Sequence, residues 1–274
     1  MAMFRIEVQE GLAHLALSRP EASNALDASF WSGLAPALQA LDRTGEIRAL
    51  LLTGEGKNFC AGMDLSAFAA GGIATDTPAQ REAFHHLARE LQGVLTAVER
   101  TRFPVIAVIQ GACVGAGLEL AAVCDLRFLA ADAYFRIEEI NIGMMADVGA
   151  LQRLPKLMPE AVVKEMAFLG ATLGAERAQQ LGFATAVAET QEAALAAAQS
   201  AAQRILARAP LAMAGSKAAL RFARDHSVAE ALEWAALMQG SIWNPADILA
   251  AMQARALKQP ATLAPLAPLQ DGAP

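Results

Sequence analysis

Three acidic residues in the middle of the chain have surroundings that suit proton transfer. Glu119 follows a glycine-rich turn, whereas Glu139 and Asp147 lie in EEINIGMMADVG, residues 138–149, which is mostly apolar between its acids. Apolar surroundings and neighbouring negative charge both raise the pKa of a carboxyl group. Carboxyl groups tuned in this way exchange protons near neutral pH, so the cluster indicates general acid–base catalysis. Each acid alone would more simply be a solvated surface residue or a helix cap, and we expect Glu138 to be one.

Two glycine-rich turns precede the acids, in LLLTGEGKNFCAGMDL and VIAVIQGACVGAGLEL. Each leads from an apolar strand pattern towards a helix start. Glycine lets a backbone approach a ligand closely, and the start of a helix leaves N–H groups unpaired. Two such N–H groups aimed at one developing negative oxygen would form an oxyanion hole. GACVGAG matches neither the dinucleotide fingerprint nor the P-loop, so neither a nicotinamide enzyme nor a nucleoside triphosphatase is favoured.

The elements that must position these groups alternate between strand and helix over the first half of the chain, which indicates an α/β fold. A helix is expected from Asp27, as its N-cap, to about Leu41, and a longer one over residues 79–100. From Leu151 to Gln180 the periodicity is helical, and FATAVAE predicts one last strand.

The remainder of the chain is predicted to be helical from Glu192 to Lys258, with interruptions near Pro210 and Pro245. We therefore expect an α/β core with the site over residues 1–195 and a helical region over 196–258. Residues 259–274 are rich in proline and alanine and are expected to form a flexible tail.

The composition narrows the classes of partner. The 274 residues carry a net charge of −6, which does not suggest a nucleic-acid surface. The 3 cysteines have no metal-ligand spacing and are typical of small buried residues in a reducing compartment. The N-terminus lacks the apolar segment of a signal peptide, and no apolar run reaches the roughly 18 residues of a membrane span. These features predict a cytoplasmic protein.

Several long motifs in a fixed order resemble the crotonase superfamily, that is, the enoyl-CoA hydratase/isomerase family. The resemblance runs from about residue 3 to 258. The stretches that carry it are SRPEASNAL, LLTGEGKNFCAGMDL, PVIAVIQGACVGAGLELAAVCDLRFLAADAYFRIEEINIG and ADVGALQRLPKLMP. Within the family, EEINIGMMADVGALQRLP is most similar to Δ3,5-Δ2,4-dienoyl-CoA isomerases.

The resemblance implies an α/β fold in which repeated ββα units form a spiral core, followed by a helical region used in trimer assembly. Trimers of this family often pair into hexamers. It also implies an acyl-CoA thioester as substrate, with no metal and with no cofactor beyond the CoA of the substrate itself.

By position in the family motifs, the oxyanion hole would consist of the backbone N–H groups of Met63 and Ala116. Family members often have glycine at the second place, and alanine serves equally if the turn needs no positive φ. CoA would lie against Arg19, Ala22, Ala61 and Met63. Arg19 could pair with a phosphate, although a solvated loop arginine is an equally good interpretation.

The resemblance to the isomerases implies that Glu139 and Asp147 act as the two proton-transfer groups. A base near C2 and an acid near C6 of a 3,5-dienoyl thioester would move both double bonds in one cycle. Because hydratases use the Glu139 position near the α-carbon, we place Glu139 at C2 and Asp147 at C6, with the reverse assignment left open.

Two alternatives remain open from the sequence. Dienoyl-CoA isomerases often carry aspartate at the position of Glu119, whereas hydratases carry glutamate there, so Glu119 and Glu139 could add water to a 2-enoyl-CoA. Asp147 argues against this hydratase, since a third negative group would disturb the water site. A non-catalytic acyl-CoA-binding scaffold is the alternative from another class, and it would be indifferent to Glu139→Gln and Asp147→Asn.

Overall fold

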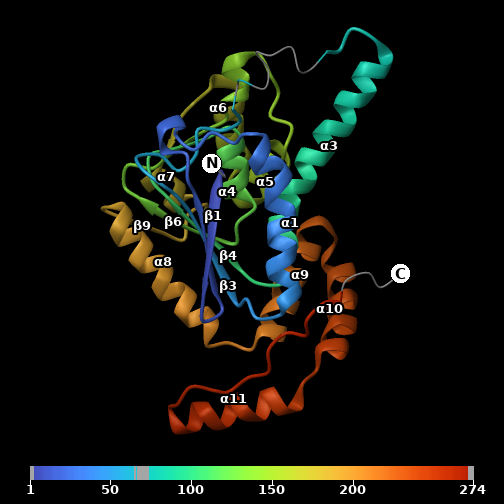
Figure 1. Ribbon diagram of the computed structural model, residues 1–274. Helices are drawn as coiled ribbons and strands as arrows, with labels where there is room; N and C mark the ends of the chain where they lie inside the picture. The colour runs from blue at the N-terminus through green and yellow to red at the C-terminus, as the bar shows by residue number, and fades with distance from the viewer. Residues whose placement is uncertain (1–2, 65, 67–73, 271–274) are drawn as a thin grey trace.

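The computed structural model describes residues 3–64, 66 and 74–270, and these form two β-sheets surrounded by helices (Figure 1). The six-stranded sheet has the order β1-β2-β3-β4-β6-β9 and the three-stranded sheet the order β5-β7-β8. Strands of the larger sheet are β1 (Phe4–Gln9), β2 (Leu12–Leu17), β3 (Ala49–Gly54), β4 (Val105–Ile109), β6 (Leu126–Ala130) and β9 (Ala186–Ala188). Strands of the smaller sheet are β5 (Ala112–Val114), β7 (Tyr134–Arg136) and β8 (Leu173–Gly174).

The strand sequences account for this arrangement. The pair β1 and β2 is an antiparallel hairpin, and from β2 onwards the neighbours in the larger sheet are parallel. Every residue of β3 and β4 is buried, as expected for continuous apolar strands at the centre of a parallel sheet. The predicted α/β fold class is confirmed.

Helices of the first part of the chain run between the strands and carry or flank the site. They are α1 (Ala28–Thr44), α3 (Pro78–Arg100), α4 (Ala116–Ala122), α5 (Ala150–Leu157), α6 (Glu160–Leu169) and α7 (Ala175–Gln180), together with the 3-10 helices η1 (Pro20–Ala22) and η2 (Glu139–Ile142). Asp27 is the N-cap of α1, as predicted, and accepts hydrogen bonds from the Ser29 and Phe30 N–H groups. The helix predicted over 79–100 is confirmed as α3, which begins with a capping box at Thr77.

The C-terminal part is helical, as its periodicity predicts: α8 (Gln191–Leu206), α9 (Pro210–Asp225), α10 (Val228–Ile242) and α11 (Pro245–Leu257). Breaks occur before Pro210 and Pro245, as expected. A further break falls at Ser227, whose hydroxyl forms a capping box with Glu230. The short strand β8 also divides the region 151–180 that the sequence predicts as wholly helical.

Helix α8 packs against the larger sheet through a stripe of alanines. Ala194, Ala198 and Ala202 recur every fourth residue and are buried against β3, β4 and β6. Figure 1 shows α8 lying along the sheet, whereas α11 lies away from it. Because α8 begins at Gln191, the predicted division between residues 195 and 196 falls inside this helix.

Part of the predicted flexible tail is tied to the body of the molecule. Leu266 is 5% exposed. The Leu269 N–H donates to the Arg43 carbonyl at 2.8 Å, and the Arg102 guanidinium donates to the Ala267 carbonyl at 3.0 Å. Residues 271–274 of the tail lie outside the described residues. No helix in the described part of the chain is both long and apolar enough to cross a bilayer.

A buried lysine fastens α9 to the core. The Lys217 ammonium group donates to the Phe103 carbonyl at 2.9 Å, the Thr101 hydroxyl at 3.0 Å and the Asp125 carboxylate at 2.7 Å. Its side chain is 8% exposed. Removing one partner of a buried ion pair is costly because the other charge and its acceptors stay desolvated.

We predict that Lys217→Met lowers the free energy of unfolding by about 3 kcal/mol, measured by urea denaturation. The matched control is Lys164→Met, which removes an exposed pair with Glu160 on one turn of α6 and should cost at most about 0.5 kcal/mol. Equal losses in the two variants would contradict this account of Lys217.

Candidate active site

The two glycine-rich turns predicted from the sequence meet in space. Cys60 pairs with Cys113 in a parallel bridge, and hydrogen bonds join the Cys60 N–H to Ala112 O at 3.0 Å and the Val114 N–H to Cys60 O at 3.1 Å. A side chain at Gly117 would lie 2.6 Å from the Cys60 carbonyl oxygen. Glycine is therefore required where α4 begins, because its absent side chain lets the two main chains approach.

This contact directs two main-chain N–H groups towards one space. Met63 pairs with Leu26 in a parallel bridge in which Leu26 bonds to the residues on either side of Met63, so the Met63 N–H points away from Leu26. Ala116 is the first residue of α4, where no intrahelical acceptor exists. Neither N–H donates to any described residue. Ala116 has no positive φ, so alanine serves here as well as glycine would.

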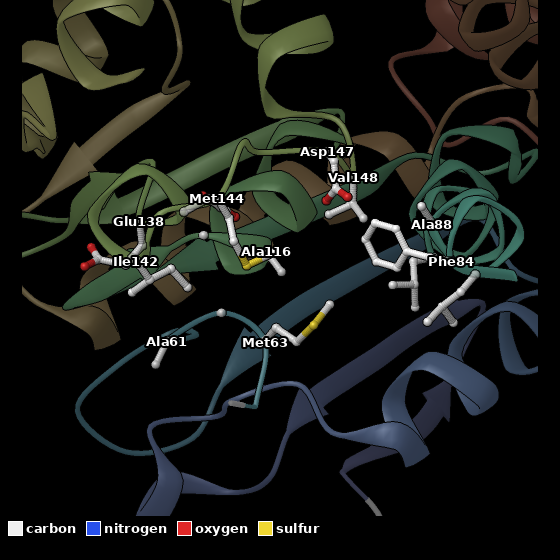
Figure 2. Close-up of a pocket in the computed structure, with 15 residues that line it drawn as sticks. Ala61, Met63, Phe84, Ala88, Ala116, Glu138, Ile142, Met144, Asp147 and Val148 are labelled. Carbon is white, nitrogen blue, oxygen red and sulfur yellow. The ribbon is translucent and has the colours of Figure 1, made fainter. Parts of the chain in front are cut away.

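Met63 and Ala116 both line a cavity of about 200 Å³. Figure 2 shows Asp147 and Val148 on one side of it and Ala61 and Met63 on the other. The lining residues are Ala61, Gly62, Met63, Phe84, Leu87, Ala88, Leu91, Gly115, Ala116, Glu138, Glu139, Ile142, Met144, Asp147 and Val148. Mostly apolar walls with a few convergent polar groups are typical of a ligand site.

Glu139 and Asp147 both line this cavity, as the acid–base hypothesis requires. Burial raises the pKa of Glu139, and the charges of Asp147 and Glu138 raise it further. Burial also raises the pKa of Asp147. The Glu139 Oε2 atom is buried and has no hydrogen-bond partner among the described residues. A buried carboxyl oxygen without a partner costs stability, so its position calls for a functional explanation.

The carboxyl group of Glu139 is held beside the oxyanion turn. Its Oε1 atom lies 3.2 Å from the place a side chain would occupy at Gly115, where φ is +53°. Both the positive φ and this close contact require glycine. Glu138, expected to face solvent, has a side chain that is 35% exposed and pairs with Arg136 at 3.2 Å, and it also lines the cavity.

Glu119 lies behind the cavity rather than on its wall. It is fully buried on α4, and its Oε1 atom accepts a hydrogen bond from the Ala150 N–H at 3.0 Å. Burial raises the pKa of Glu119 to about 8, with the charges of Glu139 and Asp147 adding to the effect. At neutral pH this carboxyl group is therefore mostly protonated.

The predicted CoA contacts divide into two groups. Ala61 and Met63 line the cavity, whereas Arg19 and Ala22 do not. The Arg19 guanidinium is already paired with Asp64 at 3.0 Å and Asp27 at 3.2 Å, so a phosphate would compete with two carboxylates. The roles of these residues in CoA binding stay predictions.

Asn24 holds the predicted CoA loops together and was missed in the sequence. It is completely buried with a φ of +56°, and its amide donates to the Glu55 and Asn58 carbonyls at 2.9 and 2.8 Å. Its Oδ1 atom accepts from the Arg19 N–H at 3.0 Å. An asparagine between Ser23 and Ala25, in a loop before a helix cap, was the only available signal.

The sequence likewise did not identify what α3 contributes. Phe84, Leu87, Ala88 and Leu91 form one apolar wall of the cavity, and the Gln92 side chain donates to the Asp147 carbonyl at 2.7 Å. A long amphipathic helix could be predicted, but nothing in its periodicity distinguishes a core-facing stripe from a ligand-facing one.

Comparison with known proteins agrees with this geometry. The sequence profile described as Enoyl-CoA hydratase/isomerase matches residues 7–262. The chain belongs to this family, whose common name is the crotonase family. The predicted family resemblance is thus confirmed.

Particular relatives are similar over most of the chain. The mitochondrial Δ(3,5)-Δ(2,4)-dienoyl-CoA isomerase of Mus musculus is 36% identical over 90% of this chain and 76% of its own. The peroxisomal Δ(3,5)-Δ(2,4)-dienoyl-CoA isomerase of Arabidopsis thaliana is 31% identical over 94% of this chain and 95% of its own. The solved structure of enoyl-CoA hydratase EchA1 from Mycobacterium marinum is 33% identical, with a TM-score of 0.82 over 96% of this chain and 99% of that one.

The raised pKa of Glu119 makes stability depend on pH. Between pH 4.5 and about 8 the unfolded carboxyl group is ionised whereas the folded one holds its proton, so stability should fall as the pH rises through this range. The variant Glu119→Gln keeps an acceptor for the Ala150 N–H but cannot ionise. We predict that its free energy of unfolding, relative to that of the natural chain, rises by a few kcal/mol between the two ends of this pH range, since each pKa unit corresponds to about 1.4 kcal/mol. Urea unfolding at both ends of the range measures the difference, and a difference independent of pH would contradict the assignment.

Proposed function

We propose that the protein is a dienoyl-CoA isomerase that converts a 3,5-dienoyl-CoA into a 2,4-dienoyl-CoA. One observation carries the proposal: Glu139 and Asp147 line the same apolar cavity as Met63 and Ala116, whose N–H groups have no partner among the described residues. The similarity to relatives named as dienoyl-CoA isomerases supports the same reaction.

In the proposed mechanism, the thioester oxygen accepts hydrogen bonds from the Met63 and Ala116 N–H groups. The Glu139 carboxylate takes a proton from C2, and the resulting negative charge spreads over the thioester oxygen and along the conjugated chain to C6. The Asp147 carboxyl group gives its proton to C6, which leaves double bonds at C2 and C4. Water then returns a proton to Asp147 and removes one from Glu139. No metal and no cofactor besides the substrate's CoA takes part.

The raised pKa values suit these roles. Asp147 must hold a proton at neutral pH to act as the acid, and burial favours its protonated form. Glu139 must be basic enough to remove a proton from carbon, and a raised pKa makes its carboxylate a stronger base. Figure 2 shows Asp147 on the side of the cavity near Phe84 and Ala88 of α3, and Glu138 on the opposite side.

The second candidate function is the hydration of an enoyl-CoA. It is supported by similarity to relatives that are named as enoyl-CoA hydratases. That reaction would need Glu119 and Glu139 to hold one water between them. Glu119 does not line the cavity, and one of its oxygens is engaged by Ala150. The other Glu119 oxygen, Oε2, is buried without a partner among the described residues, as Oε2 of Glu139 is. The position of Asp147 on the cavity wall favours the isomerase.

A non-catalytic acyl-CoA scaffold would have no use for carboxyl groups on the wall of an apolar cavity, one of which, Glu139, has a buried oxygen without a partner among the described residues. Apolar or amide side chains of similar size at positions 139 and 147 would bind an acyl chain without the cost of desolvating a charge. The retention of both acids in the cavity supports catalysis.

We predict that Asp147→Asn lowers the isomerisation of 3,5-octadienoyl-CoA by about 10²- to 10⁴-fold, because it removes the proton donor at C6. Growth of conjugated 2,4-dienoyl absorbance follows the reaction. The matched control is Asp76→Asn, which changes an exposed aspartate before α3 and should leave the rate unaltered.

A 2-enoyl-CoA offered separately distinguishes the alternatives. Loss of enoyl absorbance with this substrate, no reaction with the dienoyl thioester and full activity of Asp147→Asn would together establish the hydratase. Binding of both thioesters without turnover would establish the scaffold.

We also propose that the C-terminal helices mediate self-association into a trimer, and that trimers pair into a hexamer. Leu220 on α9 and Leu232 and Leu237 on α10 are 74%, 65% and 77% exposed. An exposed apolar surface of this kind favours a protein partner.

Sedimentation velocity is expected to give a mass of three or six chains of 28.7 kDa. Leu237→Arg should shift the protein towards single chains, because burying a leucine contributes about 1.5–3 kcal/mol. Gln179→Arg, at an exposed polar position on α7, is the control and should not change the mass. A natural protein that sediments as a single chain at micromolar concentration would refute the assembly.

The compartment is proposed to be the cytoplasm, on the strength of three buried free cysteines that suit a reducing environment. Relatives from mouse and Arabidopsis are named as mitochondrial and peroxisomal, respectively. Cell fractionation that finds the protein in the cytoplasmic fraction tests this proposal.

A further inference from the structure

The segment that carries Asp147 has no regular structure of its own. Residues 143–149 connect η2 to α5 without forming a helix or a strand. A carboxyl group on such a segment is placed only as well as its neighbours hold the main chain. Since a misplacement of about 1 Å can cost about 100-fold in rate, the groups that hold this segment bear on catalysis.

Three side chains from three helices hold the main chain around Asp147. The Gln92 amide of α3 donates to the Asp147 carbonyl at 2.7 Å. The Arg153 guanidinium of α5 donates to the Val148 carbonyl at 3.4 Å, and the Glu119 carboxyl group of α4 accepts from the Ala150 N–H at 3.0 Å. Of these three, Gln92 makes the contact with Asp147 itself.

Gln92 also lies on the helix that contacts the proposed acyl chain. Phe84, Ala88 and Gln92 recur every fourth residue and share one face of α3, with Thr96 next along that face. Phe84 and Ala88 line the cavity, whereas Thr96 accepts a hydrogen bond from Arg153 at 3.1 Å. One face of α3 therefore contacts the cavity through Phe84 and Ala88, the Asp147 carbonyl through Gln92, and Arg153 through Thr96.

This arginine is itself fixed. Arg153 donates to Glu99 through two hydrogen bonds of 3.0 and 3.1 Å, and Arg224 of α9 donates to the same carboxylate at 2.6 Å. The two arginines lower the pKa of Glu99 despite its burial, so this anchor stays charged at neutral pH. The frame behind Asp147 is rigid, and Gln92 is the link between that frame and the acyl wall.

We propose that Gln92 is a positioning residue that sets the placement of Asp147 and couples it to occupancy of the acyl wall of α3. The inference rests on the proposed isomerase function, in which Asp147 serves C6 and Glu139 serves C2. An acyl chain that fills the cavity packs against Phe84 and Ala88, and Gln92 transmits the position of this helix to the proton donor. Gln92 touches no reacting atom and has no part in the first proton transfer.

The test separates the two proton transfers in one experiment. Gln92→Met keeps the length of the side chain and removes the donor. With 3,5-octadienoyl-CoA in D₂O, the conjugated product reports the complete reaction, whereas deuterium at C2 of the recovered substrate reports removal of the C2 proton alone. The second signal needs the Met63 and Ala116 N–H groups, Glu139, and exchange of the Glu139 proton with D₂O before a deuteron returns to C2.

We expect Gln92→Met to lower kcat for the conjugated product by up to about 100-fold, with KM and the rate of deuterium incorporation at C2 nearly unchanged. Gln92→Asn, which keeps the amide but cannot reach the carbonyl, should show the same split. The control Gln180→Met removes an exposed glutamine bond within α7, to Glu176, and should change neither signal.

Equal losses of product and of C2 exchange in both Gln92 variants would show a general structural role and overturn the proposal. Unchanged product formation would overturn it too. These outcomes differ from failure of the proposed function, in which the natural protein itself would give no conjugated product from the dienoyl thioester.

Discussion

The site depends on the close approach of two main-chain segments, residues 60–63 and 112–116. Backbone hydrogen bonds between Cys60 and its partners in the second segment bring them together, and the absent side chain of Gly117 makes the approach possible. The result is that Met63 and Ala116 line one cavity with main-chain N–H groups that have no partner among the described residues. An unsatisfied buried N–H costs about 1–3 kcal/mol. The fully buried strands β3 and β4, which lead into the two segments, supply the rigidity that keeps these groups unpaired.

Carboxyl groups on the cavity wall, and Glu119 buried behind it, add a second cost to the free energy of folding. Glu119, Glu139 and Asp147 all have raised pKa values, with burial as the main cause in each. The fold therefore gives up stability to keep protons available near neutral pH. The neutral form of Glu119 also relieves its neighbours, because an ionised third carboxylate would raise the pKa of Glu139 and Asp147 still further. Glu119 holds the Ala150 N–H through Oε1, whereas its buried Oε2 has no partner among the described residues.

Much of this arrangement could be predicted from the sequence, and the failures have physical reasons. Apolar strand patterns ending in glycine located β3 and β4, and Asp27 correctly marked the start of α1. The motif order identified the family. It also identified five of the residues that line the cavity: Ala61, Met63, Ala116, Glu139 and Asp147. The sequence could not show that Arg19 is paired with two acids, because Asp64 lies 45 residues away.

Other features that the sequence did not predict also depend on contacts between residues far apart in the chain. The amide of Asn24 and the side chain of Gln92 act through main-chain carbonyls, which carry no signal in the sequence of their own residues. Leu266 in the tail also packs against residues far away in the chain. Local patterns predict elements and caps, whereas a hydrogen bond between a side chain and a distant backbone atom follows only from the tertiary fold.

The choice between isomerase and hydratase chemistry also depends on tertiary contacts rather than on local sequence patterns. The fold and the paired N–H groups serve any reaction that passes through a thioester enolate, so they do not by themselves choose a reaction. The choice lies in which carboxyl groups reach the cavity and from which direction. In this chain Glu119 is turned to the backbone of α5, whereas Asp147 is held on the cavity wall by α3. Under the proposed isomerase function, the reaction depends on the irregular segment between η2 and α5, which carries Asp147, rather than on the strands beneath it.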